Sequence, residues 1–175
     1  MLSIRNLEKY TWLAKYKILS EFYNSKLRWD DYFAIHQSQS MKAPQFIYYL
    51  DDDTDDLHFF TEAAESLGHT IKPFVNGNVM LKTLEKEKIL PDIIFLDIIM
   101  PVFNGEQILD IIKKSPKWSH IPVVLISGVY PKSSVAKYLE SGANYLMKKP
   151  AEVADLRSTI EYVLSIDWKN FQAYS

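Results

Sequence analysis

Acidic side chains crowd the stretch LDDDTDD at residues 50–56, directly behind the apolar run FIYYL. Five aspartates stand within this stretch. Carboxylates at such short separation repel one another, so the arrangement costs free energy unless a cation, a cationic side chain or solvent relieves it. Two or three carboxylates that converge on one point form a hard-oxygen site of the kind that Mg²⁺ prefers. The stretch therefore suggests a magnesium site.

Three further polar residues follow apolar runs later in the chain. Asp97 ends DIIFLD, Ser127 ends PVVLIS and Lys149 ends NYLMKK. A carboxylate such as Asp97 can attack phosphorus as a nucleophile and form an acyl phosphate. Lys149 can contact a phosphoryl oxygen as a point charge, and Ser127 can donate a hydrogen bond to another. These residue types suit metal-dependent phosphoryl transfer, in which catalysis is mainly positioning and electrostatic stabilisation.

Alternating strand and helix patterns predict the scaffold that would bring these residues together. From residue 46 onward, short apolar runs alternate with segments of helical period, as is typical of parallel βαβ units. The expected strands cover residues 46–50, 70–75, 92–97, 122–127 and 144–149. Pro73 favours an edge position for the second of them. We therefore predict an α/β fold, a doubly wound (βα)₅, flavodoxin-like domain with a five-stranded parallel sheet.

Apolar residues at spacings of three and four predict a helix after each strand. The positions that carry this pattern are Leu57, Phe60, Ala64 and Leu67; Met80, Leu81 and Leu84; Ile108, Ile111 and Ile112; Val135, Tyr138 and Leu139; and Leu156, Ile160, Val163 and Leu164. In such folds ligands bind beyond the carboxyl ends of the strands, which share one edge of the sheet. The polar residues that end the strands should therefore be distant in sequence and adjacent in space.

With these motifs in this order, the sequence resembles the receiver domain of two-component response regulators, over about residues 44–167. The matching motifs are LDDD with the acidic pair Asp51 and Asp52, FLDIIMPVFNG with Asp97, ISG with Ser127 and KKP with Lys149. The resemblance implies that Asp97 is the phosphoacceptor and that Lys149 and Ser127 contact the phosphoryl group. It also implies a cis peptide bond between Lys149 and Pro150.

The resemblance further implies a stand-alone, chemotaxis-type response regulator. A sensor histidine kinase or a histidine phosphotransfer protein would phosphorylate Asp97 in a reaction that needs Mg²⁺, with Mn²⁺ as a substitute. Phosphorylation would then change the binding of a downstream protein. The metal ligands would be Asp51, Asp52, Asp97 and the main-chain carbonyl of Ile99. Such a protein is not an enzyme, because it catalyses only its own phosphorylation and dephosphorylation.

One position departs from the family pattern. Receivers commonly carry an aromatic residue on the fifth strand, three positions before the lysine, where this sequence has Leu146. The neighbouring residue is Tyr145. Because successive residues of a strand point to opposite faces of the sheet, Tyr145 should point away from the face on which Leu146 lies.

The acidic stretch also fits other interpretations. Asp51, Asp53, Asp55 and Glu62 match ligand positions of an EF-hand loop, but Asp56 stands where that loop needs glycine. A haloacid-dehalogenase-like phosphatase would use Asp51 as its nucleophile. A receiver-like interaction module that does not signal is another alternative. Asp55 and Asp56 are interpreted only as acidic residues of a solvated first helical turn.

Composition limits the classes of partner. The 175 residues carry a net charge of −2, which does not favour nucleic acid or an anionic membrane. Seven basic residues face four acidic ones through Lys42, and 13 face 18 in the remainder. There is no cysteine, so disulfides and thiolate metal sites are excluded. No apolar run is long enough to span a bilayer, and we expect a cytoplasmic location.

The two ends are predicted to lie outside the domain. Residues 1–43 are interpreted as an N-terminal extension and linker, helical in part, which could mediate self-association into a homodimer. Residues 44–167 form the expected receiver domain. The remaining residues, 168–175, are a tail that is too short for an output domain.

Overall fold

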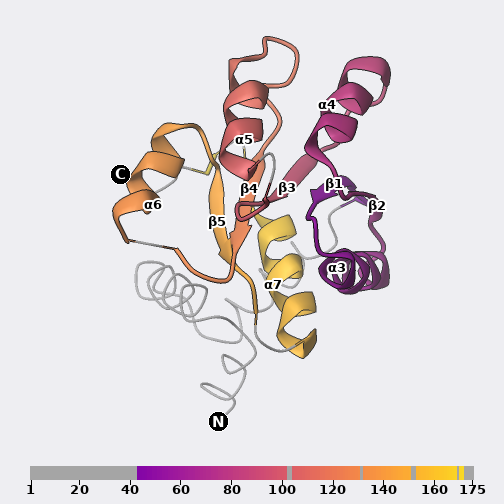
Figure 1. The fold of residues 1–175 in the computed structure, drawn as a ribbon. Helices are drawn as coiled ribbons and strands as arrows, with labels where there is room; N and C mark the ends of the chain where they lie inside the picture. Colours follow the sequence, from indigo (N-terminus) through magenta and orange to yellow (C-terminus); the bar gives the residue numbers. More distant parts are fainter. Residues whose placement is uncertain (1–42, 102–103, 131, 151–152, 169, 172–175) are drawn as a thin grey trace.

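The structure, a computed structural model, describes residues 43–101, 104–130, 132–150, 153–168 and 170–171. Its five parallel strands form one sheet in the order β2-β1-β3-β4-β5 (Figure 1). The strands are β1 (Phe46–Leu50), β2 (Thr70–Phe74), β3 (Ile93–Asp97), β4 (Val123–Ser127) and β5 (Tyr145–Lys148). The predicted α/β fold is confirmed, and β2 with its Pro73 is an edge strand, as predicted. The predicted N-terminal extension lies outside the described residues.

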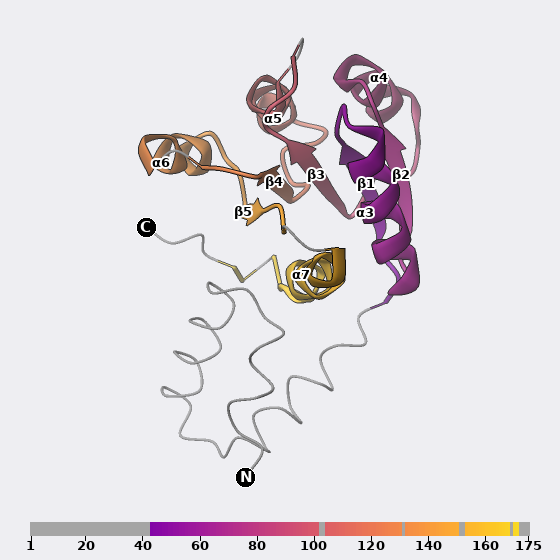
Figure 2. The ribbon, with the colours of Figure 1, turned by 60° about the horizontal axis from the view of Figure 1, so that its bottom comes forward.

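Helices cover both faces of this sheet. They are α3 (Thr54–Ser66), α4 (Gly77–Lys86), α5 (Gly105–Lys114), α6 (Lys132–Glu140) and α7 (Val153–Ser165). Helices α3 and α7 lie on one side of the sheet, and α4, α5 and α6 lie on the other (Figures 1 and 2). None of the helices in the described part of the chain is both long and apolar enough to cross a membrane.

The strands supply side chains to two cores in strict alternation. In β1, Ile47 and Tyr49 pack into the core beneath α3 and α7. Tyr48 and Leu50 pack into the core beneath α4, α5 and α6. All four are at most 2% exposed, which is why these strands read as continuous apolar runs.

The same alternation sets the direction of the polar residues at the strand ends, because side chains two positions apart point to the same face. Asp51 follows Tyr49 at this spacing, and Asp97 follows Phe95, whose side chain lies in the α3–α7 core. Ser127 instead follows Leu125, which lies in the core on the α4–α6 side. The two acids and Ser127 are therefore directed to opposite faces of the sheet.

One residue of the predicted helical patterns lies outside the buried stripe of its helix. Ile111 contributes to the apolar spacing that predicts the helix, but its side chain is 39% exposed. Ile108, Leu109 and Ile112 of α5 are buried instead. A helix that packs on a sheet buries one stripe, and the neighbouring Leu109 fills this stripe in place of Ile111.

Candidate functional site

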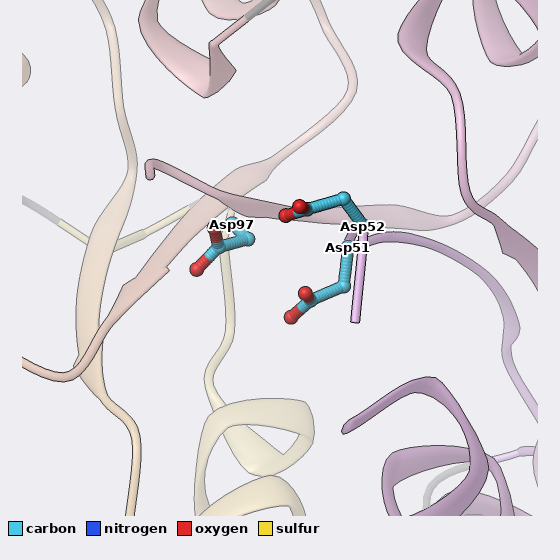
Figure 3. A group of neighbouring side chains, drawn as sticks. All are labelled: Asp51, Asp52 and Asp97. Carbon is cyan, nitrogen blue, oxygen red and sulfur yellow. The ribbon is translucent and has the colours of Figure 1, made fainter. Parts of the chain in front are cut away.

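Three carboxylates meet where β1 and β3 end. Asp51 and Asp52 follow β1, Asp97 is the last residue of β3, and one carboxylate oxygen from each lies within 4.8 Å of the others. Figure 3 shows the carboxylates of Asp51 and Asp52 directed towards Asp97. Asp51 is 1% exposed and Asp97 is 3% exposed, whereas Asp52 is exposed. The structure thus brings together the three acidic side chains that the sequence singled out.

Lys149 lies against these acids. Its Nζ is 2.8 Å from Oδ2 of Asp51 and 3.1 Å from Oδ1 of Asp97. The lysine follows Met147 by two positions, and Met147 packs in the α3–α7 core, so the strand directs Lys149 to the same side as the acids. One ammonium group therefore partly offsets the charge of two buried carboxylates, which answers part of the electrostatic problem that the sequence posed.

Asp51 is held by hydrogen bonds from its own segment. The hydroxyl of Tyr49 donates to Oδ2 of Asp51 at 2.5 Å, and the backbone N–H of Asp53 donates to Oδ1 at 3.0 Å. Burial and the charge of Asp51 raise the pKa of Tyr49 far above its usual value, so the tyrosine stays a donor. Sequence reasoning missed Tyr49, although its spacing of two residues from Asp51 placed both side chains on one face.

The pKa values of two groups of the site are both raised, which favours the neutral form of Asp97 and the charged form of Lys149. Burial, together with the charge of Asp51, raises the pKa of Asp97 to about 6, against the effect of Lys149. Burial works against the charge of Lys149, but its hydrogen bonds to Asp51 and Asp56 and the neighbouring negative charges outweigh it and raise the pKa of Lys149. The lysine is therefore a permanent cation, and Asp97 is a carboxylate whose charge is costly.

The side chain of Ser127 forms a hydrogen bond within the loop that follows β4. Its hydroxyl donates to the carbonyl of Val129 at 2.8 Å, and the side chain is 1% exposed. This orientation follows from the strand alternation, which directs Ser127 away from the acids. The backbone of Ile99 hydrogen-bonds to Asp97, while its predicted role as a carbonyl ligand stays a prediction.

The Lys149–Pro150 peptide bond is trans, and no cis bond occurs among the residues that the structure describes, so the expected cis bond is wrong. Trans is the lower-energy isomer for an X–Pro bond without a specific tertiary constraint. Lys149 reaches Asp51 and Asp97 with the trans geometry.

The interpretation of Asp56 as a solvated residue is also wrong. Its Oδ2 accepts a hydrogen bond from Nζ of Lys149 at 2.7 Å, across 93 positions of sequence. Asp53 caps α3 by accepting from the backbone N–H groups of Asp55 and Asp56. With its carboxylate used as a cap, Asp53 is not directed to the pocket, which counts against both the EF-hand and the phosphatase interpretations.

The side chains of Tyr145 and Leu146 in β5 point to opposite faces of the sheet, as predicted. Tyr145 packs on the α3–α7 side, and Leu146 packs on the α4–α6 side. On the side of Leu146, the hydroxyl of Tyr130 lies 2.8 Å from the carbonyl of Leu125 and 2.9 Å from that of Met147. Tyr130 therefore joins the loop after β4 to both β4 and β5, a contact that the sequence did not indicate.

Gly105 allows the loop after Asp97 to close against its strand. A Cβ at this position would lie 2.2 Å from the carbonyl oxygen of Asp97. We expect Gly105→Ala to lower the free energy of unfolding by about 1–3 kcal/mol, because the contact is with backbone and cannot be relieved by a side-chain rotation. Urea unfolding would measure this, with Gly128→Ala as the control, since nothing lies within 4 Å of a Cβ there. Equal midpoints for the two variants would contradict the expectation.

The chemistry of this donor set fits a hard divalent cation. The three carboxylates converge within 4.8 Å, and two of them are almost completely buried. A single lysine leaves them with excess negative charge, and carboxylate oxygens are the ligands that Mg²⁺ and Mn²⁺ accept. Fold and site together define a doubly wound α/β protein with an acidic pocket at the carboxyl edge of its sheet, where such folds bind their ligands.

Comparison with known proteins gives the family. Residues 47–161 match the response regulator receiver domain, and the chain belongs to this family. Protein PilH of Pseudomonas aeruginosa is 29% identical over 119 residues, which are 68% of this chain and 97% of PilH. Some relatives are much longer: the chain spans 28% of a probable cyclic di-GMP phosphodiesterase of Vibrio cholerae and 8% of histidine kinase P4 of Formosa agariphila.

Solved structures share the fold. The phosphorylated cyanobacterial phytochrome response regulator RcpA superposes with a TM-score of 0.65 at 22% identity, over 75% of this chain and 98% of RcpA. The Mn²⁺-bound response regulator Rcp1 superposes with a TM-score of 0.63 at 21% identity, over 75% of this chain and the whole of Rcp1. At these identities the likeness concerns the fold.

Proposed function

We propose that this protein is a single-domain response regulator that accepts a phosphoryl group on Asp97. The receiver family transmits signals through phosphorylation of an aspartate, and the family match covers residues 47–161. The observation that carries the assignment to Asp97 is the contact between its Oδ1 and Nζ of Lys149 at 3.1 Å, inside a cluster of carboxylates. PilH, which is matched over 97% of its length, consists almost entirely of this domain, and this supports the proposal.

In the proposed reaction, a carboxylate oxygen of Asp97 attacks the phosphorus of the donor. The new bond joins this oxygen to phosphorus, and the bond from phosphorus to the donor group breaks. The leaving group, a histidine nitrogen of a kinase or phosphotransfer protein or the acetate of acetyl phosphate, takes the electron pair. Lys149 contacts a phosphoryl oxygen and offsets its charge. After transfer, the hydroxyl of Ser127 turns from the carbonyl of Val129 to a phosphoryl oxygen.

Asp51, Asp52 and Asp97 are the proposed ligands of Mg²⁺, with the carbonyl of Ile99 as a further one. When bound, the ion offsets charge on the transferring group. Mn²⁺ is an alternative, supported by the metal that Rcp1 carries on the same fold. The protein changes only its own phosphorylation state and acts through binding a downstream protein. Its cytoplasmic location and a homodimer stay predictions.

Mass spectrometry of the intact protein tests this function. After incubation with acetyl phosphate and Mg²⁺, the wild type should gain one phosphoryl group, and chelation of the metal before the incubation should prevent the gain. A protein that gains nothing in either arm would instead support a receiver-like interaction module. Affinity purification with and without the phosphodonor would then identify partners whose binding depends on the modification.

A further inference from the structure

Asp56 contacts the pocket without belonging to the proposed metal site. It lies in the first turn of α3, and its Oδ2 is 2.7 Å from Nζ of Lys149, which follows β5. The side chain of Asp56 is 44% exposed and that of Lys149 is 26% exposed, so the pair is only partly shielded from water. The next residue back, Asp55, lies in the same turn and is exposed.

The ammonium group of Lys149 has as many carboxylate partners as it has N–H bonds. It carries three N–H bonds, and it has three carboxylate partners: Asp51 at 2.8 Å, Asp56 at 2.7 Å and Asp97 at 3.1 Å. To contact a phosphoryl group on Asp97, Lys149 must give up one of these partners. A divalent ion bound by Asp51 and Asp97 would weaken the hold of those two acids on the lysine. Asp56 would then remain as the partner that the ion does not share.

We propose that Asp56 is a positioning residue that competes with the incoming phosphoryl group for Lys149 and thereby limits the rate of phosphorylation. This inference rests on the proposed function of Asp97 and Lys149. Removal of the Asp56 charge leaves Lys149 with two buried partners, so the lysine stays over the pocket while one of its donors becomes available. The effect should fall on the affinity for the phosphodonor more than on the rate at saturation.

Asp56→Asn and Asp55→Asn form a matched pair of variants. Both remove one negative charge from the first turn of α3, but Asp56 contacts Lys149 at 2.7 Å. We expect Asp56→Asn to be labelled by acetyl phosphate about two- to fivefold faster than wild type at low donor concentration, with a lower apparent KM. Asp55→Asn should stay close to wild type. An Asp56→Asn rate equal to or below that of Asp55→Asn overturns the inference.

A measurement without phosphodonor or metal separates this inference from the proposed function. In a double-mutant cycle of Asp56→Asn and Lys149→Met, the shifts of the urea midpoint should not add, because the two side chains interact directly. Additive shifts overturn the ion pair and the inference with it. If the wild type is labelled but Asp56→Asn shows no gain, the inference alone fails. If the wild type is not labelled although the cycle shows coupling, the proposed function fails.

Discussion

Asp97→Ala should not be labelled by acetyl phosphate in the presence of Mg²⁺. The substitution removes the proposed nucleophile. Of the other acids, Asp51 is held by Tyr49 and Lys149, and the carboxylate of Asp53 caps α3. Intact-mass analysis would measure the loss, which should be complete within detection. Asp55→Ala is the control, because it removes an exposed acid near the site and should be labelled like wild type. Persistent labelling of Asp97→Ala would contradict the assignment.

The charge of Asp97 should also affect the stability of the folded protein. The pKa of Asp97 is raised from 3.8 to about 6, so the folded state holds its proton more tightly than the unfolded state. The stability that this proton contributes is complete below about pH 4 and is lost as the pH rises through about 6. In metal-free buffer at pH 7, the free energy of unfolding of Asp97→Asn should therefore exceed that of wild type by about 1–3 kcal/mol. The variant should accordingly unfold at a higher temperature. The difference should shrink towards pH 4.

Lys149→Ala should retain metal binding and lose most of its reactivity. The three proposed carboxylate ligands remain, so a divalent ion should still bind, whereas the charge that stabilises the transferring group is absent. We expect labelling by acetyl phosphate to slow by about 100-fold, the usual effect of removing one such group. Calorimetric titration with Mg²⁺ would measure the first property, and the time course of intact mass would measure the second.

Lys148→Ala is the matched control for this experiment. Lys148 is exposed and precedes Lys149 by one position, so the strand alternation directs it to the other face. Its loss changes the net charge by the same amount and should leave the labelling rate near that of wild type. If both variants slow equally, net charge and not the contact with Asp97 governs the rate. If Lys149→Ala is labelled at the wild-type rate, the role of the lysine is wrong.

The fold could be predicted from the sequence because helices cover both faces of the sheet. Continuous apolar runs result from this coverage, and each predicted strand agrees with the structure within one residue at either end. The clustering of Asp51, Asp97 and Lys149 followed from one rule, that parallel strands end at the same edge. Helix α5 showed the limit of this approach, since its apolar pattern did not distinguish the exposed Ile111 from the buried Leu109.

Contacts that depend on how the helices and strands pack could not be predicted from the sequence. The pair of Asp56 and Lys149 exists because α3 and the end of β5 meet on one side of the sheet, and the chain places them 93 positions apart. The strand alternation directs Ser127 away from the acids, but the bond of its hydroxyl to the carbonyl of Val129 depends on the geometry of the loop after β4. The family resemblance led to a cis bond before Pro150 that the structure does not have.

The opposite directions of Asp97 and Ser127 have a consequence for how a signal could leave this molecule. Asp97 is directed to the side of α3 and α7, while Ser127 continues into a loop held by Tyr130 over the side of α6. Any shift of the serine towards Asp97 would pull that loop across the end of the sheet. A protein that binds over α6 could thus detect the modification without approaching the acidic pocket, leaving the donor's approach unobstructed.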